Sequence, residues 1–230
     1  MSNQRDFDPE DRNVRVSAQY VPIAAEFMAK GDVLYCLNGF LVEPHPDGGV
    51  LIVATNSHVM AVIHDTDGFA NGTWICEAPA GLVKACRMRR KRPNERAEHL
   101  HLVGSVGYVT SADFPEGGDP TEIGPCHLDV THAPPIDGRF LDWRKAIPAA
   151  VQPVSRISAN SQYLRLAEEA AKAGGIPIPH VNLFPSGEGG AYVMRVAHMP
   201  EFVALVMPMI EDDTTAIPGW LRPAEPKAAA

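Results

Sequence analysis

The feature that most constrains the fold is a pattern that occurs three times: a short strand, an amphipathic helix, and then two or three strands. The copies cover about residues 14–70, 73–135 and 152–213. Alternating apolar residues predict the strands, and apolar residues three and four apart predict the helices. The chain is therefore expected to have an α+β fold assembled from three copies of one building block, called here the first, second and third unit.

The first unit begins with a strand at residues 14–16, followed by a helix in SAQYVPIAAEFMAKG. Because Pro22 must lie in the first helical turn, the helix is expected to begin near Tyr20, and Gly31 is placed to end it. Its apolar face is expected to carry Val21, Ala24, Ala25 and Met28. Strands are expected at 34–44, 50–57 and 58–65, with PHPDGG as a hairpin turn.

The second unit has a strand at 73–76 and Pro79 at the start of a helix that Pro93 ends. Leu82, Val83 and Cys86 are expected to face inward. Lys84, Arg87 and Lys91 are spaced three and four residues apart and share the opposite side. Strands are expected at 99–104, 105–110 and 125–132.

The third unit should open with a strand at 154–158, followed by Asn160 as the cap of a helix over 161–173. Two pairs with a spacing of four, Arg165 with Glu169 and Glu168 with Lys172, support its solvent face. Strands are expected at 180–187, 189–198 and 202–210.

Four strings carry most of the functional information: LYCLNGFLVEP at 34–44, LIVATNSHVMAV at 51–62, IDGRFLDWRKAIP at 136–148 and VALVMPMI at 203–210. Together and in this order they resemble the bacterial DNA sliding clamp, the β subunit of the replicative polymerase. That family has a YxLNG strand, a VATDGHRLAV strand, a DGRFPDYRRVLP-like connector and a terminal VMPMR. The resemblance covers about residues 14–213.

The resemblance implies a DNA clamp fold, with sheets outside and helices lining a central hole. The first and second units and their connector (14–148) resemble the clamp's middle domain, and the third (149–213) resembles the second half of its last domain. Asn38-Gly39, which alone is typical of a hairpin turn, would then be a kink or bulge within one strand. A bacterial clamp closes as a dimer with six units per chain, whereas this chain has three, so twelve units would need four copies.

In the family these strings converge on a groove that holds partner peptides. The positions that match this groove are Leu37, Thr55, Ser57, His58, Val59, Met60, Leu141, Lys145, Ala146, Leu205, Met207, Pro208 and Met209. Aliphatic and methionine side chains offer the adaptable apolar surface that such a groove needs, although each apolar member could equally be core. The expected partners are clamp-binding peptides of polymerase or other replication proteins.

Four departures from the family would make this groove more apolar and less basic than the usual one. Asn56-Ser57 replaces Asp-Gly, and Val59 replaces the arginine after the histidine. Leu141 replaces proline, and Ile210 replaces the arginine after MPM.

One segment is strongly basic although the net charge of the chain is −8. Seven Lys and Arg residues and a single Glu lie between 84 and 96. A concentrated basic segment can dock a polyanion on an acidic protein because screening confines each charge to about 8–10 Å. The expected contacts to double-stranded DNA, through phosphates, are Lys84, Arg87, Arg89, Arg90, Lys91 and Arg92. A solvated helix end is the alternative.

The composition excludes little. Of the residues, 45% are apolar, but no apolar run approaches the ~18–20 residues of a membrane span. The first residues lack the pattern of a signal peptide, and the four cysteines lack CxxC spacing, so a reduced, cytoplasmic setting is expected. Residues 1–13 and 214–230 are expected to be disordered or flexible; the latter contain Ile217, Trp220 and Leu221, which could occupy an apolar groove or be only a tail.

Two other functions compete with a ring-forming clamp. An enzyme is disfavoured because HExxH, CxxC, GxSxG and phosphate-binding glycine loops are absent from the sequence. His99 and His101 share one face of a strand without a third ligand at a recognisable spacing, so they are expected to face solvent. The second competitor is a regulator without a ring, which captures clamp-binding peptides or a clamp subunit. The expectation is thus a non-catalytic protein without cofactor or metal, acting in DNA replication, and a homo-oligomer.

Overall fold

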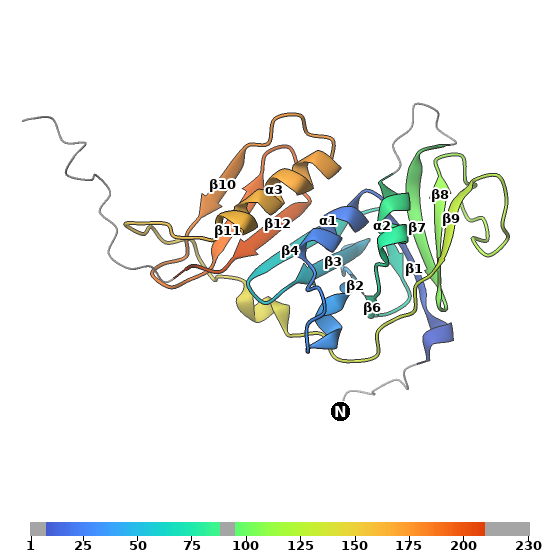
Figure 1. The fold of residues 1–230 in the computed structure, drawn as a ribbon, viewed down its shortest axis with the longest axis horizontal. Helices are drawn as coiled ribbons and strands as arrows, with labels where there is room; N and C mark the ends of the chain where they lie inside the picture. Colours follow the sequence, from blue (N-terminus) through green and yellow to red (C-terminus); the bar gives the residue numbers. More distant parts are fainter. Residues whose placement is uncertain (1–7, 88–94, 210–230) are drawn as a thin grey trace, which may run out of the picture.

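A computed structural model of the chain describes residues 8–87 and 95–209. It has two antiparallel sheets and, in the described part, three α-helices in a row over one side of them (Figure 1). The helices are α1 (Tyr20–Phe27), α2 (Ala80–Cys86) and α3 (Ser161–Ala173). The mixed α+β class inferred from the sequence is confirmed.

The smaller sheet has five strands in the order β5-β1-β7-β8-β9. These are β5 (Phe69–Ala70), β1 (Asn13–Ser17), β7 (Ala97–Val103), β8 (Val106–Ser111) and β9 (His127–His132). The larger sheet has seven strands in the order β10-β11-β12-β4-β3-β2-β6. These are β10 (Val181–Phe184), β11 (Tyr192–Val196), β12 (Phe202–Val206), β4 (Val59–Asp65), β3 (Val50–Thr55), β2 (Phe40–Pro44) and β6 (Trp74–Cys76).

The first two units exchange their first strands. Strand β1 belongs to the first unit but pairs with β7 of the second, with Val16 opposite Leu100. Strand β6 belongs to the second unit but pairs with β2 of the first, with Cys76 opposite Phe40. Each sheet therefore contains a strand from the other unit, and the two units form a single domain.

The third unit extends the larger sheet. Strand β12 pairs with β4 from Phe202, opposite Ile63, to Val206, opposite Val59. Helix α3 packs beside α1. Buried residues of all three units share one core between the helices and the sheets, in which the rings of Phe27 and Phe202 meet edge-on at 5.9 Å between centroids.

The helix boundaries follow the local chemistry. Helix α1 begins at Tyr20 as expected, but it ends at Phe27, before Gly31. Helix α3 has its expected bounds, and the side chain of Asn160 accepts a hydrogen bond from the backbone N–H of Gln162 at 2.9 Å. Lys172 pairs with Glu168 as expected, at 2.6 Å, and also with Glu169 at 3.3 Å.

Two expectations about strands are wrong. Residues 34–44 are not one kinked strand, because Tyr35–Asn38 forms a 3-10 helix and β2 begins only at Phe40. Gly39 between them passes so close to β6 that an added Cβ would lie 2.6 Å from the carbonyl oxygen of Cys76. Residues 154–158 form no strand within the described third unit.

The N-terminal residues are structured from Asp8 onward, although 1–13 were expected to be disordered. Pro9–Asp11 forms a 3-10 helix, and the buried Arg12 donates a hydrogen bond to the carbonyl of Ala133. Burial lowers the pKa of the Arg12 guanidinium. Within the described residues, no helix is long and apolar enough to cross a membrane.

Candidate functional site

The fold brings together two of the strings that were singled out in the sequence, although about 150 residues separate them. In the β4–β12 ladder Met60 lies opposite Leu205. Beyond the ladder, the backbone N–H of Met207 donates to the carbonyl of His58 at 2.9 Å. The 55–60 and 205–209 segments therefore form one continuous surface at the junction of the first and third units.

Four of the expected groove residues form a buried floor on the side of the larger sheet that faces away from the helices. Leu37, Met60 and Leu205 belong to one apolar cluster there, and each is at most 4% exposed. Thr55 lies opposite Met60 and is equally buried. Its hydroxyl is satisfied because it donates to the carbonyl of Val59 at 2.8 Å.

The connector covers part of this floor with side chains that were not among the expected site residues. Ile136, Phe140 and Trp143 are buried in the same cluster. The guanidinium of Arg144 lies 4.2 Å from the centre of the Trp143 ring and pairs with Glu43 on β2. Phe140 and Trp143 are the two aromatic residues of the connector string, and their spacing of three could have identified them as its anchors.

The turn between β3 and β4 explains one departure from the family pattern. The side-chain oxygen of Asn56 accepts hydrogen bonds from the backbone N–H groups of His58 and Val59, both at 3.0 Å, as an aspartate could. Ser57 has φ of 74°, a left-handed conformation that favours glycine. Asn56-Ser57 thus makes the turn for which Asp-Gly is better suited.

The remaining expected groove residues, except Val59, lie outside the buried floor. Pro208 is half-buried, and the others are exposed: Ser57, His58, Leu141, Lys145, Ala146, Met207 and Met209. Met207 and Met209 are 44% and 52% exposed, so they offer apolar surface to a partner. Lys145 pairs with Asp142 at 3.1 Å, and the His58 ring stacks against Tyr163 of α3.

Val59 is not part of this surface. It is buried in the main core, where it lies opposite Val206 on the helix side of the sheet. Because successive strand residues point to opposite faces, Val59 cannot share a face with Met60. The assignment of Val59 to the groove is therefore wrong.

A cavity of about 610 Å³ lies beside the connector, on the side of β6. The connector supplies Ile136 to Arg144, and the sheet supplies Leu41, Glu43 and Ile75. Leu141 lines this cavity, so the apolar surface reaches from the connector's outer side toward β6. The sequence did not single out this cavity.

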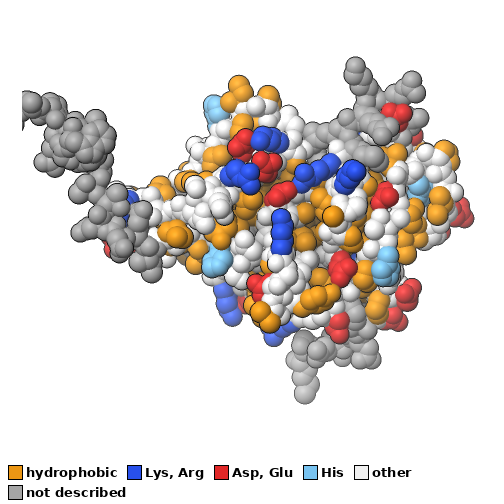
Figure 2. All heavy atoms as spheres, viewed as in Figure 1, with side chains coloured by type: hydrophobic (Ala, Val, Ile, Leu, Met, Phe, Trp, Pro, Cys, Tyr) orange, Lys and Arg blue, Asp and Glu red, His pale blue; other side chains and the backbone are white. Residues whose placement is uncertain are grey.

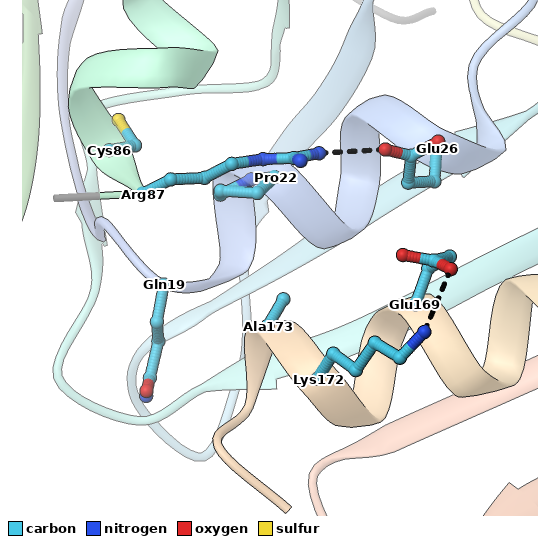
Figure 3. Close-up of a pocket in the computed structure, with 8 residues that line it drawn as sticks. All are labelled: Gln19, Pro22, Glu26, Cys86, Arg87, Glu169, Lys172 and Ala173. Atoms are coloured by element: carbon cyan, nitrogen blue, oxygen red, sulfur yellow. Dashed lines mark hydrogen bonds and ion pairs between the residues drawn. The ribbon is translucent and has the colours of Figure 1, made fainter. Parts of the chain in front are cut away.

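The expected DNA contacts lie at the helix side of the molecule. Lys84 on α2 is exposed, and Arg87 follows the last residue of that helix. Arg89, Arg90, Lys91 and Arg92 lie outside the described residues. A cavity of about 220 Å³ lies where α1, α2 and α3 meet. Figure 3 shows the residues that line it. Across it Arg87 pairs with Glu26 of α1 at 2.7 Å, which neutralises its charge locally.

Charges of both signs are intermixed over this face (Figure 2). Besides the Arg87–Glu26 pair, Lys172 pairs with Glu168 and Glu169 on α3. Within the described residues, Lys84 is the exposed cation of the expected set that is left without such an ion pair.

The histidines of the smaller sheet lie differently from expectation. His101 is buried, contacts the Thr110 hydroxyl at 3.2 Å, and packs against Phe114, so the expectation that it faces solvent is wrong. Burial, followed by the neighbouring His99, lowers the pKa of His101 to about 4. Among the described residues there is no group of three His, Cys, Asp or Glu side chains suited to a metal ion.

All four cysteines are free thiols, as expected. Cys76 and Cys86 are buried, and burial raises the pKa of their thiols to about 11 and about 12. These two side chains are core residues with little thiolate at neutral pH.

The chain is similar to solved bacterial sliding clamps. A DNA polymerase sliding clamp from Pseudomonas aeruginosa superposes with a TM-score of 0.55 at 16% identity, over 92% of this chain and 70% of the clamp. The DNA polymerase III subunit beta of Borrelia burgdorferi, solved with a natural product, gives a TM-score of 0.59 at 12% identity, over 90% and 65%. The Bartonella birtlesii sliding clamp, bound to griselimycin, gives 0.57 at 15% identity, over 92% and 69%.

No protein-family model matches the chain, and a search of curated proteins found no match. At this level of identity the solved structures show the fold: the chain has the sliding-clamp fold over about nine tenths of its length. The resemblance noticed in four short strings is therefore confirmed at the level of the fold.

Proposed function

We propose that this protein is a non-catalytic, sliding-clamp-like protein that binds short clamp-binding peptides of replication proteins. The observation that carries the proposal is the β4–β12 junction, where exposed Met207 and Met209 border a floor of Leu37, Met60 and Leu205. Flexible methionine side chains can adapt to an apolar partner, and the buried floor below them holds the surface in place. The clamps of Bartonella and Borrelia, which share the fold, were solved with bound griselimycin and with a natural product, respectively.

The proposed peptide lies across the buried floor, with one large apolar side chain against Met207. The 55–60 turn would form one wall of the site. Such anchors commonly contribute over 1 kcal/mol each. Val59 and Arg87 take no part in this site, because one is in the core and the other is at the helix side.

The test is a fluorescence titration of a labelled peptide of about six residues with two large apolar side chains. Met207→Ala should weaken binding about tenfold, because it removes an exposed anchor. Ile123→Ala is the matched control, because Ile123 is a 70% exposed apolar residue far along the chain in the second unit. Equal affinity of Met207→Ala and the parent would place the peptide elsewhere. Met60 is less suitable for this test because its truncation would also disturb the buried cluster.

DNA encirclement is the second candidate. It is favoured by the row of three helices on one side of the sheets (Figure 1). Lys84 on α2 is exposed. The Arg87–Glu26 pair and the acidic residues of α3 reduce the positive charge that the described residues bring to this face. A titration of duplex DNA at two salt concentrations distinguishes a clamp that holds DNA from a regulator that binds only peptides or a clamp subunit.

A further inference from the structure

The third unit has a sheet edge without a ladder partner, and its segment 154–158, whose end Ser158 bonds to Tyr192 and Met209 of the same unit, forms no strand. Among the described residues, β10 pairs with β11 on one side and has no ladder partner on the other. Its end residues are exposed, Val181 to 39% and Phe184 to 40%, while Leu183 packs against the main core. The segment 154–158, which has the position of a first strand, forms no strand, and its Ile157 is 44% exposed.

The other two units show what is missing. In each of them the first strand pairs with the strand that follows the helix of the other unit: β1 with β7, and β6 with β2. The third unit has both halves of this exchange, segment 154–158 and strand β10, but no second unit to exchange with. This explains why 154–158 is not a strand although its sequence predicted one.

The end of segment 154–158 is bonded next to the last strand of its own unit, and the end of β1 is bonded to the last residue of β4, although through different groups. Two residues separate Ser17 from α1, and two residues separate Ser158 from α3. The backbone N–H of Ser17 donates to Asp65 at the end of β4 at 2.6 Å. Correspondingly, the carbonyl of Ser158 accepts from the N–H of Met209, just beyond β12, at 2.9 Å. Segment 154–158 therefore starts from the position of an exchanged strand.

Strand β10 also differs from the other sheet edges in the described chain. Strand β5 has only two residues, and the connector covers β6 through a hydrogen bond from Ile136 to Ile75. Strand β9 carries Asp129 and two histidines. Strand β10, VNLF, contains neither a charge nor a proline. Proteins usually protect free edges by such devices, so an unprotected edge indicates a pairing site.

We propose that a second copy of this chain occupies the β10 edge, by a reciprocal exchange across a two-fold axis. Segment 154–158 of each copy pairs antiparallel with β10 of the other, and the two third units together complete one two-unit domain. The exchange is self-complementary, as a two-fold interface must be, because one chain supplies both the strand and the edge.

The register follows from the faces of the strands. Val16 and Cys76 lie four residues before their helices, and both face the main core. Ile157 lies four residues before α3. On β10 the helix-side face carries Val181 and Leu183, because these lie opposite the core-facing Val196 and Met194. The partner's Ile157 is therefore placed against Val181, which would bury both of these exposed side chains.

The test is the mass of the full chain in solution, by sedimentation across a range of concentrations. The parent is expected as a dimer of the 24.9 kDa chain, or as an even-numbered assembly of such dimers. Val181→Lys should lose the dimer, because a lysine on an edge strand opposes pairing. Val33→Lys is the control, because Val33 is fully exposed in the first unit, and it should leave the mass unchanged. A monomeric parent, or an assembly that both variants leave intact, overturns the proposal.

A cross-link separates loss of the interface from loss of the fold. Two chains, one carrying Ile157→Cys and the other Val181→Cys, both with Cys36→Ser and Cys126→Ser, should form a disulfide with each other when mixed and oxidised. A chain with Ile123→Cys in place of Val181→Cys should not. Val181 is not among the residues of the peptide site, so Val181→Lys should keep the peptide affinity of the parent. Failure of one proposal is therefore distinguishable from failure of the other.

Discussion

The third unit uses the same pattern as the first two units, which together form one domain. The strands of that domain are all paired, whereas the third unit lacks its first strand in the described structure. In the domain, both first strands are paired, and β2 and β7 each have neighbours on both sides. In the third unit, the first strand is not formed and β10 has a single neighbour. The difference shows that this unit is half of a structure: it becomes a sheet here because β12 attaches to β4, and it remains open where its own counterpart would be.

Attachment of the third unit therefore depends on its packing against the first unit. Weakening that packing should lower the free energy of unfolding more than any other change considered. Phe202 is fully buried and meets Phe27 of α1 edge-on. Phe202→Ala should lower the free energy of unfolding by about 3–5 kcal/mol, because it leaves a cavity in the shared core. The measurement is a denaturant titration at a concentration where the chain is monomeric.

Phe184→Ala is the matched control, since Phe184 is 40% exposed on β10 and should cost less than about 1 kcal/mol. Hydrogen exchange should locate the loss in β10–β12 first. Equal costs for the two phenylalanines would mean that the third unit does not depend on the Phe27–Phe202 contact.

Acid should destabilise the domain of the first two units more than the third unit, because the buried His101 lies in that domain. The pKa of His101 is lowered to about 4 by burial, whereas in the unfolded chain a histidine takes up its proton near 6.5. The stabilisation is therefore complete above pH 6.5 and is lost as the pH falls toward 4, by roughly 2–3 kcal/mol. Thermal unfolding across this pH range measures it.

His101→Gln should flatten the pH dependence, and His132→Gln, at an exposed position of β9, should not. If both variants keep the slope of the parent, protonation of another group governs the acid response, and the complete domain is not the acid-sensitive part.

The smallest expected effect compares the helices themselves. Asn160 caps α3 through its side chain, whereas Gln19 makes no such bond at α1. Asn160→Ala should cost about 1 kcal/mol, and Gln19→Ala less than about half of that. Thermal melts of both variants test whether α3 depends on its cap more than the better-packed α1. A larger loss for Gln19→Ala would contradict this.

Local signals predicted what local chemistry controls. The Asn160 cap and the glycines after Ala173 placed α3, and Pro22 placed the start of α1. The four short strings indicated the fold, and two of them, 55–60 and 205–209, are adjacent in the structure. The sequence also indicated the repeated pattern, although the third copy lacks its first strand in the described structure.

Long-range packing decided the rest. Gly39 was expected to be a kink within one strand. The structure shows instead that β6, a strand of the second unit, passes so close to Gly39 that a side chain would not fit there. Val59 belongs to the core and Met60 to the outer cluster because strand alternation separates them once β4 lies between two strands. His101 is buried by Phe114, from a loop whose path no local pattern specifies.

The segment 154–158 shows most directly what the sequence alone does not determine. Its sequence determined a propensity for a strand, as it did for residues 14–16, which form β1. Only the tertiary structure decided which of the two became one, because a strand needs a neighbouring backbone to satisfy its N–H and C=O groups. Residues 14–16 form a ladder with β7 of the same chain, whereas residues 154–158 are in no ladder of the described structure, although the carbonyl of Ser158 accepts from the N–H of Met209.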